Sequence, residues 1–198
     1  MALAIATTSV FSQEQGKVRF NLNFSFPSAR GEGFGFGMGF YDIQLAYNLQ
    51  DNMNIGVKAG YGGLVKSSLY SSDDGFAMVM NAYTLGAFTY YFNLGGSFAP
   101  FVGVGLGPYY TCLDHHYANQ RKNVEIESGT KFGGVLTGGF EWGRFRFGLE
   151  YNFVPGTALK IGNSIAPDLS IDNSYFAICF GFYLGGGRWY AKWDQRRW

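Results

Sequence analysis

The chain has 198 residues, of which 15% are charged and 19% aromatic, and it contains 30 glycines. An average soluble domain carries about 25% charged residues and roughly 7% glycine, so this composition is atypical of one. The mean hydropathy of -0.04 lies far below that of a bundle of membrane helices. A formal net charge of +1 gives no support to nucleic-acid binding. The composition favours a sheet with one face in lipid and the other face polar or lined by glycine.

At the N-terminus, residues 2–11 form a short apolar run that resembles the end of a secretory signal peptide, although no Lys or Arg precedes it. We expect residues 1–13 to be a truncated or non-standard leader, and a frayed N-terminus is the alternative. Residues 16–185 are then the folded domain, and residues 186–198 are a tail that follows it.

Residues 17–26 alternate strictly between polar and apolar side chains. Alternation with a period of two indicates a half-buried strand. Similar patterns predict seven further strands, at about residues 33–49, 54–65, 76–92, 98–110, 131–142, 145–153 and 174–184. The uncharged stretch 75–113 is interrupted by Asn, Pro and Gly residues, whereas a spanning helix needs about 20 predominantly apolar residues. We therefore interpret that stretch as two strands joined by a turn.

The connections between these strands alternate in length. Short ones lie at 50–53, 93–97 and 143–144, long ones lie at 66–75, 111–130 and 154–172, and the connection at 27–32 is intermediate. Short periplasmic turns and longer extracellular loops are typical of outer-membrane barrels. The sequence thus predicts an all-β fold, an eight-stranded antiparallel up-and-down transmembrane β-barrel. It would lie among the lipids of the cell outer membrane, with both termini in the periplasm.

Three strands carry a family resemblance: the Gly-aromatic segment 33–40, the segment Ala99-Pro100-Phe101-Val102-Gly103-Val104-Gly105-Leu106-Gly107, and the closing Phe180-Gly181-Phe182-Tyr183-Leu184. Over residues 16–185 the chain resembles the outer-membrane barrel superfamily that contains OmpA, OmpX and OmpW. The resemblance implies a barrel with little or no pore, which the outer-membrane insertion machinery assembles. It transfers no catalytic residue to this sequence.

If the apolar stripes face lipid, the opposite faces of the strands send polar side chains into the barrel lumen. An eight-stranded barrel is just wide enough inside for side chains to fill it. The set is mixed in sign, so we expect a salt-bridged plug in the periplasmic half, which fixes strand register. A gated proton or ion path is the alternative. The predicted plug comprises Lys17, Arg19, Asp42, Gln44, Lys58, Glu141, Arg146 and Glu150.

In the extracellular half, residues with the same parity as Asp42 are apolar. They suggest a pocket that is open to the outside, because Met and aromatic side chains suit an adaptable apolar site. The alternative is a β-bulge near Phe40 and Tyr41, which would exchange the two faces and leave the aromatic residues in lipid. The candidate pocket residues are Phe34, Phe36, Met38, Phe40, Met78 and Met80.

Residues that could carry chemistry are few. Asp114, His115 and His116 fall in the predicted loop 111–130, where adjacent histidines point to opposite sides and make poor metal ligands. Cys112 at the extracellular rim and Cys179 within a strand are predicted to be too far apart for a disulfide. No set of residues forms a nucleophile, base and orienting group. We expect no enzyme activity, no cofactor and no metal.

The tail is cationic and rich in tryptophan, with Arg188, Trp189, Trp193 and Trp198 as its candidate contact residues. It could anchor at the membrane interface or dock on a partner. The leading functional hypothesis is a structural, adhesive or accessory barrel, which could contact envelope protein subunits through loops 111–130 and 154–172 or through the tail. The alternative is a carrier or narrow channel for a small hydrophobic ligand through the upper lumen.

Overall fold

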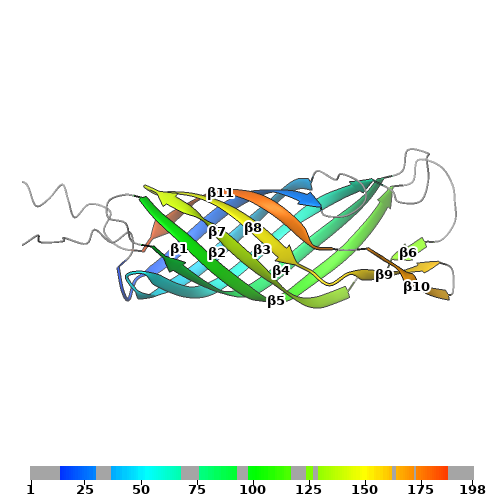
Figure 1. Cartoon of the computed structure of the whole chain (residues 1–198), viewed down its shortest axis with the longest axis horizontal. Helices are drawn as coiled ribbons and strands as arrows, with labels where there is room; N and C mark the ends of the chain where they lie inside the picture. Colours follow the sequence, from blue (N-terminus) through cyan, green and yellow to red (C-terminus); the bar gives the residue numbers. More distant parts are fainter. Residues whose placement is uncertain are drawn as a thin grey trace, which may run out of the picture.

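The computed structural model describes residues 14–29, 37–67, 76–92, 98–116, 124–126, 129–161, 164–171 and 173–186. Within these residues, eight strands form one closed antiparallel barrel, which Figure 1 shows with its long axis horizontal. The predicted fold class is therefore confirmed. No helix in the described part of the chain is long and apolar enough to cross a membrane. The barrel strands are β1 (Val18–Ala29), β2 (Gly37–Gln50), β3 (Met53–Ser67), β4 (Phe76–Tyr91), β5 (Phe98–His116), β7 (Gly129–Trp142), β8 (Phe145–Phe153) and β11 (Tyr175–Gly185).

Closure of the barrel depends on the first and last strands. The order around the wall is β1-β11-β8-β7-β5-β4-β3-β2, so each barrel strand lies beside its neighbours in sequence. β1 pairs with β2 on one side and with β11 on the other, where Phe24 lies opposite Phe180. Closure satisfies the backbone of the first and last strands, which a membrane requires.

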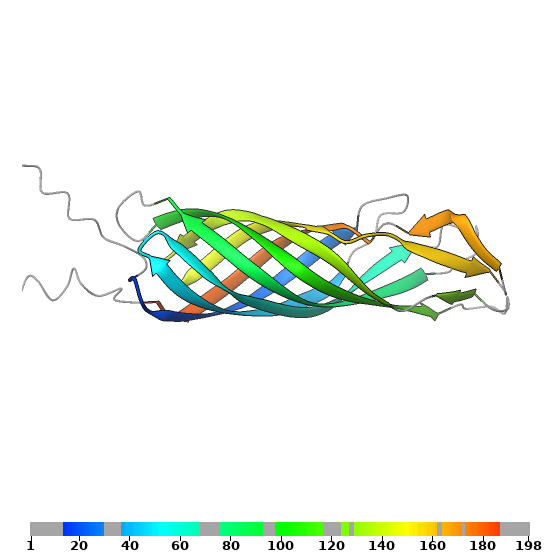
Figure 2. The ribbon, with the colours of Figure 1, turned by 90° about the horizontal axis from the view of Figure 1, so that it is seen from below.

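Beyond the extracellular end, the long connections contain strands that the sequence did not predict. β6 (Val124–Ile126), β9 (Thr157–Ile161) and β10 (Ser164–Ile171) form a separate three-stranded sheet in the order β10-β9-β6. It lies past the right-hand end of the barrel in Figures 1 and 2. The expectation of plain loops at 111–130 and 154–172 was wrong, because β6 finds its partner β9 more than thirty residues away.

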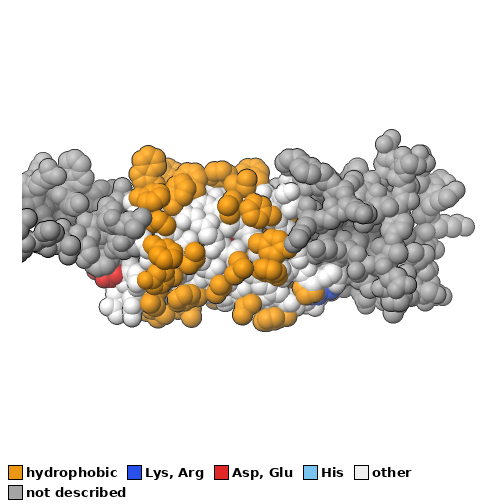
Figure 3. All heavy atoms as spheres, viewed as in Figure 1, with side chains coloured by type: hydrophobic (Ala, Val, Ile, Leu, Met, Phe, Trp, Pro, Cys, Tyr) orange, Lys and Arg blue, Asp and Glu red, His pale blue; other side chains and the backbone are white. Residues whose placement is uncertain are grey.

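The barrel wall has polar residues inside and apolar residues outside. Along β2, the side chains of Tyr41, Ile43 and Leu45 are exposed, whereas the alternate residues Asp42 and Gln44 are buried. Figure 3 shows the resulting apolar surface in orange across the middle of the barrel. This distribution is the reverse of a soluble barrel and matches a lipid-facing one.

Exposed aromatic residues mark both edges of this apolar surface. Phe98 begins β5, Tyr110 lies twelve residues further along the strand, and both are about half exposed. Their separation along a strand tilted by about 45° corresponds to about 28 Å across the membrane. The apolar band of known outer-membrane barrels is about 25 Å tall. The wall is therefore tall enough to cross the hydrocarbon layer.

A bulge interrupts the pairing of β2 with β3. The register shifts between Met38, which pairs with Gly63, and Tyr41, which pairs with Tyr61. Two residues of β2, Gly39 and Phe40, therefore lie opposite one residue of β3, the arrangement of a β-bulge. Positions before and after the bulge have opposite parity, so the upper end of β2 does not continue the inward stripe of its lower part.

At the periplasmic mouth, Asn48 links the segment that precedes β1 to the residue that follows β11. Its side-chain Nδ2 donates to the backbone oxygens of Glu14 and Gly186, each at 3.0 Å. The amide of Glu14 donates to the same Gly186 oxygen at 2.8 Å. Gly185 and Gly186 have φ angles of 79° and 83°, which few other residues adopt readily. β11 ends at Gly185, and the amide of Gly186 donates to the Val18 carbonyl at 2.9 Å.

Candidate functional site

The lower lumen contains a buried cluster centred on Glu141 of β7. Arg19 of β1 binds both carboxylate oxygens, with 3.0 Å from Nη1 to Oε2 and a closer contact from Nη2 to Oε1. Arg146 of β8 and the hydroxyl of Tyr91 donate to the same Oε1 at 2.9 and 3.1 Å. Arg19 also lies over the ring of Tyr183, 3.6 Å from its centroid. Every charge in this cluster is thus hydrogen-bonded away from water, as buried charges require.

A second ionic cluster lies higher in the lumen. The Lys58 ammonium donates to Glu150 Oε1 at 2.5 Å and lies 3.6 Å from Asp42 Oδ2. Asn23 Nδ2 donates to the other Asp42 oxygen at 2.6 Å. All four residues are buried. The lower cluster has two cations and one anion, and this upper cluster has one cation and two anions, so the two together are neutral.

Two amide side chains extend the lower cluster along the lumen. Arg19 Nε donates to Asn21 Oδ1 at 2.6 Å, and Asn21 Nδ2 donates to Gln44 Oε1 at 3.0 Å. Between the clusters lies an internal cavity of about 10 Å³, with Lys58 and Arg146 among its lining residues. A cavity needs about 10–15 Å³ to hold one water molecule. This cavity therefore holds no more than about one water molecule.

Above the ionic clusters, the lumen is apolar and aromatic. The rings of Phe40 and Tyr175 stack with their centroids 5.0 Å apart, and the ring centroids of Tyr83 and Tyr109 are 5.3 Å apart. The Tyr109 hydroxyl donates to Asn152 Oδ1 at 2.8 Å, which satisfies it inside the barrel. The whole buried cluster is Phe40, Leu64, Tyr83, Leu85, Tyr109, Val135, Val154, Tyr175, Ala177 and Cys179. The predicted apolar character of this level is present, but as a packed core.

The structure places seven of the eight predicted plug residues inside the barrel and corrects one. Lys17 precedes β1 and is exposed, because the strand begins at Val18 and the chain before it runs along the rim. The sequence-based set missed Tyr91, which links Glu141 to Arg146. The period-two alternation of the predicted strand 76–92 could have placed Tyr91 on the inner face of the wall.

Of the six candidate pocket residues, only Phe40 and Met80 have described side chains, and these two lie on opposite faces of the wall. Phe40 is buried, but Met80 is only half-buried and has the opposite parity to the buried Asn81 and Tyr83, so it belongs to the outer face. Met80 faces outward by the regular alternation of β4. In β2 the bulge, which was the alternative considered for this region, lies between Met38 and Tyr41. Phe34 and Phe36 lie outside the described residues. For Met38 and Met78 the structure describes only their strand positions, which pair with Gly63 and Val65.

The remaining candidates do not form a reactive site in the described residues. His115 and His116 lie on the extended end of β5, opposite Ala77 and Phe76 of β4, and not in a loop as expected. Cys112 and Cys179 are not joined in a disulfide, and Ser25 Oγ donates to Cys179 Sγ at 3.0 Å. Within the described ranges, no group of His, Cys, Asp and Glu could hold a metal ion. Tail residues 188–198 lie outside those ranges.

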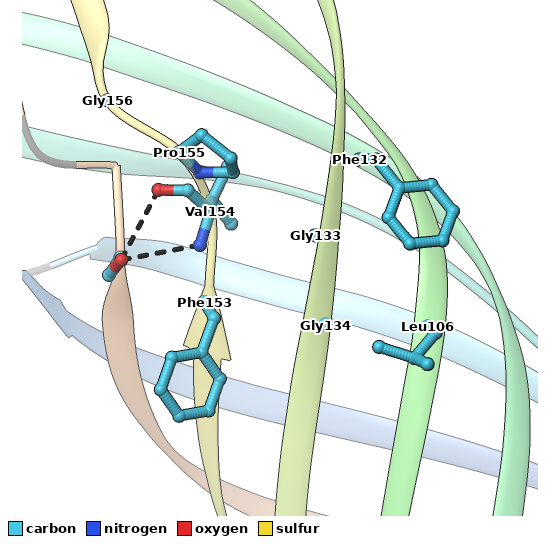
Figure 4. Close-up of a pocket in the computed structure, with 9 residues that line it drawn as sticks. Leu106, Phe132, Gly133, Gly134, Phe153, Val154, Pro155 and Gly156 are labelled. Atoms are coloured by element: carbon cyan, nitrogen blue, oxygen red, sulfur yellow. Dashed lines mark hydrogen bonds between the residues drawn. The ribbon is translucent and has the colours of Figure 1, made fainter.

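The outer wall has a groove where β8 leaves the barrel (Figure 4). The pairing of β7 with β8 ends at Gly134 and Phe153 in the described ladder, whereas β7 continues upward beside β5. Ser174 holds the departing chain through 3.3 Å contacts with the backbone N and O of Val154. The groove has a volume of about 540 Å³ and is lined by Leu106, Phe132, Gly133, Gly134, Phe153, Val154, Pro155, Gly156 and Ser174.

Solved structures with a similar fold are small outer-membrane barrels. The Neisserial surface protein A has 12% sequence identity and a TM-score of 0.55, over 86% of this chain and 99% of that one. The outer membrane protein OprG from Pseudomonas aeruginosa has 14% identity and a TM-score of 0.50, over 87% and 97% of the two chains. Such low identities establish the fold alone. No curated protein has a significantly similar sequence.

A family model does match. Residues 1–183 match the model for the outer membrane protein beta-barrel domain. This match covers almost the whole chain and agrees with the lipid-facing band, the closed wall and the neutral, buried charges in the lumen. The chain therefore belongs to the outer membrane protein beta-barrel domain family and is a multi-pass barrel of the Gram-negative outer membrane, with both termini periplasmic.

Proposed function

We propose that this protein is a closed, non-conducting outer-membrane barrel with a structural, adhesive or accessory role. The observation that supports the proposal is the set of buried side chains inside the barrel, where two ionic clusters lie below an aromatic cluster. A conducting lumen would need a continuous aqueous path along its axis. The internal cavity between the clusters, with its volume of about 10 Å³, holds no more than about one water molecule.

The part of the chain available for partners is the extracellular sheet. Residues 157–161 and 164–171 form two of its strands and stand clear of the barrel (Figure 2). An edge strand presents unpaired backbone groups, to which another chain can add. A rigid, closed barrel that carries this sheet supports a role in contacts with envelope subunits or external surfaces.

We also propose that the protein is not an enzyme. Its buried Arg, Lys, Asp and Glu side chains in the described residues are engaged in ion pairs with one another, which supports a structural role for them. Catalysis would instead require groups that converge on a pocket. Membrane-embedded activity at the described outer wall would have to use the apolar, aromatic surface seen in Figure 3.

Conductance in a planar bilayer tests the closed lumen. The wild-type protein should insert without stepwise currents in molar potassium chloride. Replacing both members of an ion pair, in the double variant Lys58→Ala and Glu150→Ala, should produce small currents because it widens the filled level. The matched control replaces the lipid-facing neighbours Val57 and Leu149 with Ala and should remain silent. Regular stepwise currents from the wild type would refute the proposal.

The same preparation tests the alternative, a carrier for a small hydrophobic ligand through the upper lumen. An apolar fluorescent probe should gain no emission from an internal site, because Phe40, Tyr83 and Tyr175 already occupy that level. Probe binding that is lost in Phe40→Asp but kept in Tyr41→Asp would favour the carrier and overturn the closed barrel.

A further inference from the structure

We propose that the groove on the outer wall binds an acyl chain of lipid A, the anionic glycolipid of the outer leaflet. The inference goes beyond the closed-barrel function, and it rests on a different face of the molecule. It begins from a discontinuity in the wall. β8 stops pairing with β7 at Phe153, and Pro155, which has no N–H to donate to a strand ladder, follows immediately.

The groove is an open depression in which exposed apolar side chains flank glycines of β7. Leu106, Gly134 and Phe153 lie on one rung across three strands and on the same outward face. Leu106 and Phe153 are 62% and 47% exposed, so they stand on either side of the glycine. Phe132, two residues above Gly134 on the same face, is 69% exposed. The result is a slot in the apolar surface, as Figure 4 shows for these labelled residues.

The size and surroundings of the slot fit a lipid chain. Its volume of about 540 Å³ lies within the 300–1,000 Å³ that is usual for ligand sites. It is continuous with the lipid-facing band, so membrane lipid is the molecule already in contact with it. Pockets that bind apolar molecules are mostly lined by hydrophobic and aromatic residues, as this one is.

Position and charge identify the leaflet and the headgroup. The groove lies at the level of Leu106 and Pro108 of β5, in the half of the apolar band that is nearer to Tyr110 than to Phe98, which places it in the outer leaflet. Lys131, one residue above Phe132, donates to the Gly156 carbonyl across the top of the gap. Its positive charge at the rim is complementary to the phosphates of an anionic glycolipid.

A glycine substitution tests the site. A Cβ at Gly134 would lie 2.9 Å from Leu106 Cδ2 and 3.1 Å from the backbone oxygen of Gly105, so Gly134→Leu fills the slot if the flexible Leu106 side chain moves and the strand shifts by a few tenths of an ångström. The matched control is Gly138→Leu on the same strand and face, where the nearest atom to a Cβ is a backbone oxygen at 3.8 Å. Both proteins must first show the heat-dependent gel mobility of folded barrels.

The measurement is native mass spectrometry of the full chain with purified lipid A. The wild type and Gly138→Leu should retain one lipid A, and Gly134→Leu should lower its retention about tenfold, the effect of losing about two buried methylene groups. If Gly134→Leu does not fold, Phe132→Ser, which removes a wall, takes its place with the same expectation. Equal retention by the groove variant and the control would overturn the proposal, as would equal retention of phosphatidylethanolamine.

Discussion

Replacing Glu141 with glutamine removes the only anion of the lower ionic cluster and leaves its shape almost unchanged. In the native barrel, this carboxylate accepts hydrogen bonds from Arg19, Arg146 and Tyr91 and is fully buried. After the substitution, two guanidinium groups face each other without a counterion. Arg146→Met has a different consequence, because the remaining Arg19–Glu141 pair stays neutral and bidentate.

The two substitutions should therefore differ in cost. Breaking a buried ion pair by removing one partner typically destabilises a protein by about 3–5 kcal/mol. Glu141→Gln belongs at the upper end of that range, since the carboxylate serves two cations. Arg146→Met loses hydrogen bonds to a charged group, about 1.5–3 kcal/mol, and its apolar side chain can pack on Phe101, over which Arg146 lies at 3.7 Å. The net loss for Arg146→Met should be about 1–2 kcal/mol.

Urea unfolding in lipid vesicles, followed by gel mobility, measures both free energies. The double variant, Glu141→Gln with Arg146→Met, retains one uncompensated cation in place of two. Its loss should be smaller than the sum of the single losses by more than about 1 kcal/mol, as coupled neighbours show. Equal losses for the two single variants, or strict additivity in the double variant, would refute the electrostatic account of this cluster.

Three further predictions concern packing and access. Gly139→Ala should lower the free energy of unfolding by about 1–3 kcal/mol in the same assay, because a Cβ there would overlap a backbone carbonyl of β8. Gly138→Ala, at the adjacent outward position, is the control and should change that free energy by less than about 0.5 kcal/mol. Phe40→Ala should cost about 3–5 kcal/mol, since it empties a fully buried site against a stacked ring, and a loss below 1 kcal/mol would contradict the packed upper core. In the folded protein, maleimide should modify half-buried Cys112 but not buried Cys179 until urea is added, and rapid modification of both thiols would show that the lumen is open.

The strands could be predicted because lipid outside and charge inside impose alternation with a period of two. That pattern located all eight barrel strands, and the end of β8 at Phe153 coincides with the prediction. The same parity argument put Asp42 and Glu150 inside the barrel. It could not show which charges meet, because the partners Arg19 and Glu141 are 122 residues apart and their contact depends on closure of the wall.

The errors occurred where the alternation is broken or where pairing is distant. The bulge at Phe40 changes the parity of β2, and no local residue pattern distinguishes it from a regular strand. Three-residue β6 is too short for a periodic signal and exists only because β9 pairs with it. Lys17 continues the alternation of β1 in sequence, but the strand ladder ends at Val18.

The long-range ion pairs of the lumen have a consequence for the order of events during membrane insertion. Lys58 on β3 and Glu150 on β8, one of its two anionic partners, are separated by 92 residues, so a chain that inserted one hairpin at a time would carry the lysine across with only Asp42 of β2 near it. A lysine facing lipid at the midplane costs about 2–4 kcal/mol. The sheet must therefore curl toward closure before or during its passage, so that charges travel on the concave side and neutralise one another as the last strand meets the first.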